Sequence, residues 1–116
     1  MDVAFGDDSI RQQALASVDA NPADAPLWAR RTLLSLIDAA DSLQDLRTTT
    51  SVRLARLDDD PRSGFRYSSE GAEMYLYPIH ANGEQMSTGL GPDSLNCVRA
   101  VKLMAIRCHV EAARTT

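Results

Sequence analysis

The chain has 116 residues, of which 44% are apolar and 24% charged, so it is long enough for one domain with a single core and is unlike a disordered or fibrous protein. Its formal net charge of −4 argues against a protein that holds nucleic acid by overall charge, and no apolar run approaches the roughly 18 residues of a membrane-spanning helix. The start of the chain has no secretory signal, and two cysteines are too few for a disulfide framework. We therefore expect one cytoplasmic domain over residues 1–116, with no membrane partner and with a flexible tail over 111–116.

Two elements are predicted at the start of the chain. Residues 3–5 are apolar and could form an edge strand. Residues 7–9 are all of N-cap type, and apolar positions recur at helical spacing over residues 10–18, which predicts a helix. The Asn-Pro pair at residues 21–22 is expected to end it.

A stronger amphipathic helix is predicted next. Asp24 can cap it, and Pro26 falls in its first turn, where proline is favoured. Its apolar side extends from Leu27 to Ala40. Ser42 can then cap a short further helical turn.

The second part of the chain is typical of β-structure. Residues 52–56 and 65–67 predict two strands, the turn residues of 58–64 lie between them, and residues 74–79 predict a third strand. Residues 98–110 fit either a helix or a buried strand, because periodicity alone does not separate the two. Two helices ahead of a run of strands predict an α+β fold. In this fold an N-terminal strand and two helices pack on one face of a three- to five-stranded, mainly antiparallel sheet.

The sequence has no recognisable metal or cofactor motif. His80, Cys97, Cys108 and His109 lack the spacing of a zinc site, and no phosphate-binding loop, dinucleotide fingerprint or nucleophile elbow occurs. The three aspartates of residues 58–60 could bind a hard cation, but such a run is more often a solvated turn. We predict neither a bound metal nor a cofactor.

Charge and aromatic residues point to the predicted sheet. Residues 1–46 carry eight acidic and three basic side chains, whereas residues 47–116 carry eight acidic and nine basic ones, almost all arginine. Arginine beside aromatic rings on a sheet can hold phosphates and stack bases. In the other interpretation the tyrosines cover the helices, the arginines are solvated, and a GC-rich genome explains their number. The residues of this grouping are Arg53, Arg62, Arg66, Arg107, Tyr67, Tyr75, Tyr77 and His109.

Several strings are similar to toxins of RelE/ParE-type toxin–antitoxin pairs, and within them to the HigB-like, plasmid-maintenance-killer branch. Residues 31–46 resemble the family's long helix with its L-x-x-A-x-S-L-x-D-L ending, and residues 1–5 resemble its first strand. Residues 57–71 align with its hairpin without a gap, and residues 101–106 are similar to its last strand, which favours a strand there. The resemblance covers nearly the whole chain and implies a RelE-like fold. The matched hairpin positions are Leu57, Asp60, Phe65 and Gly71.

The resemblance implies a function on the ribosome. Toxins of this family bind the ribosomal A site and cleave mRNA, and an antitoxin encoded beside each toxin neutralises it. We therefore expect a HigB-like mRNA interferase that inhibits translation, with the ribosome, mRNA and a helix-turn-helix, HigA-like antitoxin as partners. Attack of a ribose 2′-hydroxyl on phosphate needs proton transfer and nearby cations. The expected catalytic residues are Arg66 and His109, and the expected RNA contacts are Arg53, Arg62, Tyr67 and Arg107.

The usual catalytic positions of the family are degenerate in this chain. Ala55 and Asp58 stand where the family has a histidine and a lysine, and Met74 stands where it has an arginine. His109 aligns with the family's histidine when the alignment is shifted by one residue. A carboxylate at Asp58 reverses the local field that a lysine would create.

A second hypothesis follows from these departures. It is a catalytically inactive toxin-fold protein that acts as a protein-interaction module, with Trp28, Leu33 and Ile37 as its docking surface. An unrelated α+β domain is a third possibility.

Overall fold

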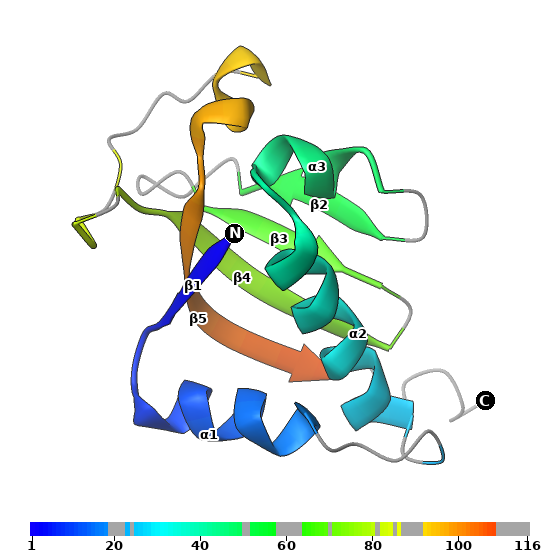
Figure 1. Cartoon of the computed structure of the whole chain (residues 1–116). Coiled ribbons are helices and arrows are strands. Elements are labelled where there is room, and N and C mark those ends of the chain that lie inside the picture. Colours follow the sequence, from blue (N-terminus) through cyan, green and yellow to red (C-terminus); the bar gives the residue numbers. More distant parts are fainter. Residues whose placement is uncertain are drawn as a thin grey trace.

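A computed structural model gives the fold and describes residues 1–18, 23, 25–49, 52–57, 64–69, 71–80, 82–84, 86 and 92–108. In this part of the chain, five strands form one sheet, accompanied by three α-helices and one short 3-10 helix (Figure 1). In chain order the elements are β1 Asp2–Phe5, α1 Asp8–Val18, α2 Ala25–Ala39, α3 Leu43–Arg47, β2 Arg53–Arg56, β3 Phe65–Ser68, β4 Ala72–Pro78, the 3-10 helix η1 Pro92–Cys97, and β5 Ala100–Cys108.

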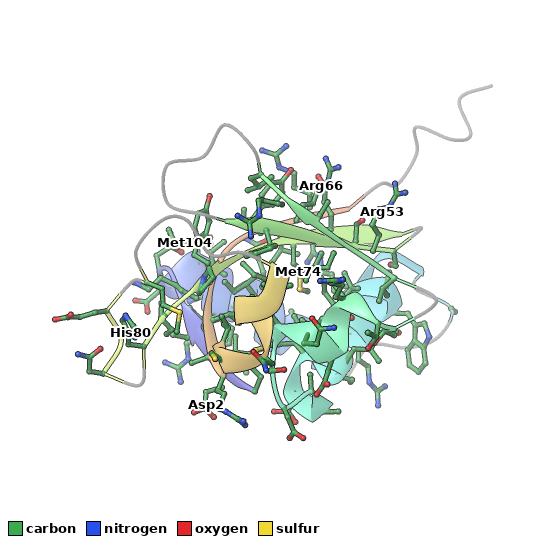
Figure 2. The ribbon with its side chains drawn as sticks, turned by 90° about the horizontal axis from the view of Figure 1, so that it is seen from above. Asp2, Arg53, Arg66, Met74, His80 and Met104 are labelled. Carbon is green, nitrogen blue, oxygen red and sulfur yellow. The ribbon has the colours of Figure 1, made fainter. Side chains whose placement is uncertain are left out.

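The strands are ordered β1-β5-β4-β3-β2 across the sheet. From β2 to β5 each strand pairs antiparallel with the next, whereas β1 pairs parallel with β5 at the edge. The α-helices pack against this sheet, and Figure 2 shows them on one side of it. The predicted α+β class is therefore confirmed, including the mainly antiparallel sheet.

The segment that periodicity could not assign is strand β5, as the resemblance favoured. Its buried positions Val101, Leu103 and Ile106 do not keep the spacing of two that a regular strand has. The reason is an irregularity in the pairing with β4, where Tyr75 is opposite Ala105 and the next residue, Leu76, is opposite Leu103. One additional residue on β5 shifts the alternation by one place, so this strand imitates a helical pattern.

The core lies between the helices and one face of the sheet. Leu33 and Ile37 of α2 are completely buried, as are Met74 and Leu76 of β4. Ile10 and Ala14 of α1 join them, whereas Leu15 of the same helix stays 55% exposed, so α2 buries its apolar side more completely than α1 does.

Two of the predicted helix caps can be compared with the structure. The Ile10 backbone N–H donates to Asp7 Oδ1 at 2.8 Å, so Asp7 caps α1. Ser42 holds the N-cap position of α3 with extended backbone, but its side chain makes no capping hydrogen bond. Instead, the Asp41 N–H donates to Asp45 Oδ2 at 2.8 Å.

Some sequence predictions fall outside the described residues. They concern the Asn-Pro helix stop, the Asp24 cap, the aspartate run of residues 58–60, the two site residues Arg62 and His109, and the tail over 111–116.

Candidate nucleic-acid interface

The two faces of the sheet carry different side chains. Residues directly opposite each other on paired strands lie on the same face, and the register makes four such rows across β2 to β5, which alternate between the two faces. Leu54, Tyr67, Met74 and Ile106 form a row that faces the helices. The neighbouring row, which contains Arg53 and Arg107, therefore lies on the other face. This row is Arg53, Ser68, Glu73 and Arg107.

The face turned away from the helices is called the open face here. Figure 2 shows Arg53 and Arg66 projecting from the sheet on this side, and Arg53, Arg66 and Arg107 are all exposed. Lys102 joins them as the register partner of Tyr77. The charged and aromatic residues that define the open face are Arg53, Arg66, Glu73, Tyr75, Tyr77, Lys102 and Arg107.

Tyr75 lies beside two of the arginines, Arg66 and Arg107. Its hydroxyl donates to Glu73 Oε1 at 3.1 Å, and the guanidinium carbon of Arg107 is 5.2 Å from the centre of its ring. Arg66 is directly opposite Tyr75 on β3. The ring is half-buried, so the hydrogen bond and the cation–π contact hold an accessible aromatic surface among positive charges.

Tyr77 occupies the same face but is covered. Tyr77 is only 6% exposed. The Leu57 N–H donates to the Gly64 carbonyl at 2.9 Å at the base of the hairpin between β2 and β3, and Gly64 lies beside the Tyr77 ring. A Cβ atom on Gly64 would lie 2.5 Å from Tyr77 Cε2, which shows how closely the backbone approaches the ring. Tyr77 is therefore a packing residue, and Tyr75 is the accessible tyrosine of the two.

Tyr67 corrects one prediction. Its side chain is 0% exposed and faces the helices, so it cannot stack on an RNA base from this position. Burial also raises the pKa of the Tyr67 phenol to about 12, because the charged phenolate would lose its hydration. Arg66 and Tyr67 are consecutive residues of β3, so alternation along the strand already puts their side chains on opposite faces, and the register shows that Tyr67 is on the face toward the helices.

The predicted docking surface on α2 is also corrected. Leu33 and Ile37 are in the core, whereas Trp28 is 37% exposed. Five residues along an α-helix correspond to a rotation of about 140° from Trp28 to Leu33, so the three residues do not share a face. Trp28 instead lies beneath the guanidinium of Arg31, 4.8 Å from its ring centre.

Two residues that stand at catalytic positions of the toxin family, Ala55 and Met74, lie on opposite faces of the sheet. Met74, which stands where the toxin family has an arginine, is completely buried on the helix-facing side. Ala55 is half-buried on the open face opposite Arg66. Of the predicted site residues, the structure therefore brings together Arg53, Arg66 and Arg107.

Comparisons with protein-family models, curated proteins and solved structures find no match for this chain. Within the described ranges, no group of three or more histidine, cysteine or acidic side chains is arranged to hold a metal ion. No helix in those ranges combines the length and the apolar character needed to cross a membrane.

Proposed function

We propose that this chain is a HigB-like toxin domain that inhibits translation and acts on RNA through the open face. The observation that supports this most directly is the position of Arg66 and Arg107 beside the accessible ring of Tyr75, with Arg53 on the same face of the sheet. The chain as a whole has a net charge of −4. Such a local group of cations is therefore not a consequence of overall charge. The α+β fold is consistent with the resemblance to RelE/ParE-type toxins.

The chemistry assigned to these residues has two parts. The arginines bind phosphates of a single RNA strand, and the Tyr75 ring stacks on a base. In cleavage, the 2′-oxygen attacks the adjacent phosphorus, the bond to the 5′-oxygen breaks, and a 2′,3′-cyclic phosphate and a 5′-hydroxyl result. Arg66 faces the negative charge that develops on the phosphate, and His109, which follows β5 directly in sequence, moves a proton.

The partners and location proposed with this function follow from the resemblance. They are a helix-turn-helix, HigA-like antitoxin encoded beside the gene, and the ribosome with its mRNA, in the cytoplasm.

Inducible expression in bacterial cells tests the function. We expect the wild-type chain to arrest growth and to produce mRNA cuts that primer extension detects. Arg66→Ala and His109→Ala should each lower cleavage by about a hundredfold or more, because each removes a cation or a proton-transfer group. Arg11→Ala, an exposed arginine on α1, is the matched control and should remain toxic. Unchanged growth at equal levels of soluble wild-type protein would contradict the proposal.

A second candidate function is a toxin-fold interaction module without catalysis. The observation that favours it is the exposure of two large apolar side chains on the helices, Leu15 at 55% and Trp28 at 37%. This candidate predicts unaffected growth in the same experiment, together with normal folding of Arg66→Ala and His109→Ala.

A further inference from the structure

The outer edge of β1 has backbone groups that the sheet does not use. β1 is the edge strand next to β5. The N–H groups of Asp2 and Gly6 donate to the carbonyls of Arg99 and Leu103 at 3.1 and 2.9 Å. In a strand, only alternate residues turn their N–H and C=O groups toward a given neighbour. Val3 and Phe5 therefore direct these groups outward, where no strand of the described chain pairs with them.

An apolar groove lies beside this edge. It has a volume of about 330 Å³ and is lined by Val3 and Phe5 of β1, by Ala14 and Leu15 of α1, and by Leu34 of α2. Val3 and Phe5 thus contribute both the outward backbone groups and part of the groove wall. Leu15, although apolar, is 55% exposed at its rim.

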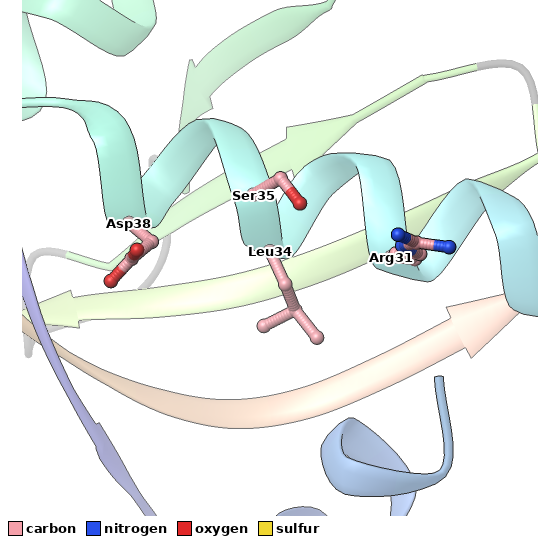
Figure 3. A pocket seen from close by; sticks show the side chains of 4 residues that line it. All are labelled: Arg31, Leu34, Ser35 and Asp38. Carbon is pink, nitrogen blue, oxygen red and sulfur yellow. The ribbon is translucent and has the colours of Figure 1, made fainter. Parts of the chain in front are cut away.

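The groove continues along α2 and has acidic groups at its β1 end. Asp2 and Asp38 line it together with Met1, whose ammonium group donates to the Asp38 carbonyl at 3.2 Å. Leu34 and Asp38 also line a neighbouring hollow of about 320 Å³ with Arg31 and Ser35 (Figure 3). The first 46 residues carry eight acidic and three basic side chains. In the groove itself the two carboxylates outnumber the one Met1 ammonium, so a positively charged occupant is favoured over a negatively charged one.

From this geometry we propose that β1 accepts an extended segment of a partner protein as an additional strand. The segment pairs its backbone with Val3 and Phe5, places apolar side chains at every second position in the groove, and carries lysine or arginine toward Asp2 and Asp38. Strand addition uses main-chain hydrogen bonds for affinity and alternate side-chain pockets for specificity. The outward backbone groups and the apolar groove lie together at this edge. The groove is on the helix side of the sheet, and the arginines of the open face are on the other side.

A display library of random peptides about six residues long, the usual length of a strand, tests the proposal. Peptides are selected on the wild-type protein and counter-selected on Leu15→Lys, which places a charge in the groove at an exposed position. We expect enriched peptides to alternate apolar residues, to carry a cationic flank, and to bind Leu15→Lys at least about tenfold more weakly. Trp28→Lys, on an exposed apolar residue that does not line the groove, should bind them as the wild type does. Peptides without alternation, or equal binding to Leu15→Lys, would overturn the proposal.

Amide hydrogen exchange of the full chain gives an independent reading. The amides of Val3 and Phe5 should exchange quickly in the free protein and become protected at saturating peptide, while the Gly6 amide, bonded to Leu103, stays protected in both states.

Val3→Pro removes only an outward N–H, which an edge strand tolerates, and should weaken peptide binding about tenfold. Bound peptide without protection of Val3 and Phe5 would overturn the proposal. If the Val3 and Phe5 amides become protected without peptide as the protein concentration rises, a second copy of the chain occupies the edge, and the proposal is overturned. Arg66→Ala should bind the peptides normally, so this test is separate from that of RNA binding.

Discussion

The hydroxyl of Tyr67 has an unusual environment for a polar group. It is completely buried, and it is the one buried side-chain oxygen or nitrogen in the described part of the chain without a hydrogen-bond partner. A buried polar group of this kind costs about 1–3 kcal/mol of folding free energy. Its position between Leu54 and Met74 in the register explains the burial.

Tyr67 should make the folded state sensitive to alkaline pH. Its pKa is raised from 10.0 to about 12, so between these pH values the unfolded chain loses a proton that the folded chain retains. The free energy of unfolding should therefore fall as pH rises through this window, by about 1.4 kcal/mol per pH unit from this residue. Urea unfolding at several pH values measures it. Tyr67→Phe, the control, should lose this contribution and be no less stable than wild type at neutral pH. An identical pH dependence in the two proteins would show that Tyr67 ionises freely when folded.

At the scale of single residues, the sequence predicted which residue types make the candidate site but not all of their positions. Arg53, Arg66 and Arg107 lie together on the open face, in agreement with the predicted grouping. Tyr67 was the wrong tyrosine and Tyr75 the accessible one. Alternation along β3 already shows that Tyr67 cannot share a face with its neighbour Arg66, whereas the position of Tyr75 beside Arg66 follows only from the register. Register depends on pairing between distant segments, which local pattern does not contain.

At the scale of elements, the first helix depends on a local signal. Asp7 Oδ1 accepts the Ile10 N–H at 2.8 Å, and removal of such a cap costs about 1 kcal/mol. We expect Asp7→Ala to lower the free energy of unfolding by that amount in urea titration. Asp7→Asn is the matched control, because asparagine caps equally well without the charge. A similar loss in both variants would assign the effect to charge, and no loss in Asp7→Ala would show that the cap is dispensable.

The elements that the sequence predicted best are those with local causes. The cap at Asp7 and the apolar side of α2 led to correct helices, and turn residues separated β2 from β3. β5 was ambiguous because its irregularity at Met104 mixes two spacings. The 3-10 helix η1 and the parallel pairing of β1 with β5 were not predicted, since the latter joins the two ends of the described chain and has no local signature.

At the scale of the whole molecule, the sheet separates two surfaces of different character. The open face carries arginines around Tyr75, whereas the edge of β1 and the helices beside it form an apolar groove with acidic groups. The net charge of −4 therefore averages two unlike regions. This arrangement would let one chain bind RNA on one side while a partner protein binds at the β1 edge.

The central claim is that the open face binds RNA through its arginines. Fluorescence anisotropy with a labelled single-stranded RNA, repeated over a range of salt concentrations, tests it most directly. We predict that affinity falls steeply with salt, that Arg66→Ala makes the slope of log affinity against log salt shallower by about 0.7, and that replacing Arg53, Arg66 and Arg107 together makes it shallower by about 2. Arg11→Ala should leave the slope unchanged. Salt-insensitive binding, or equal slopes for the wild type and the triple variant, would contradict the account.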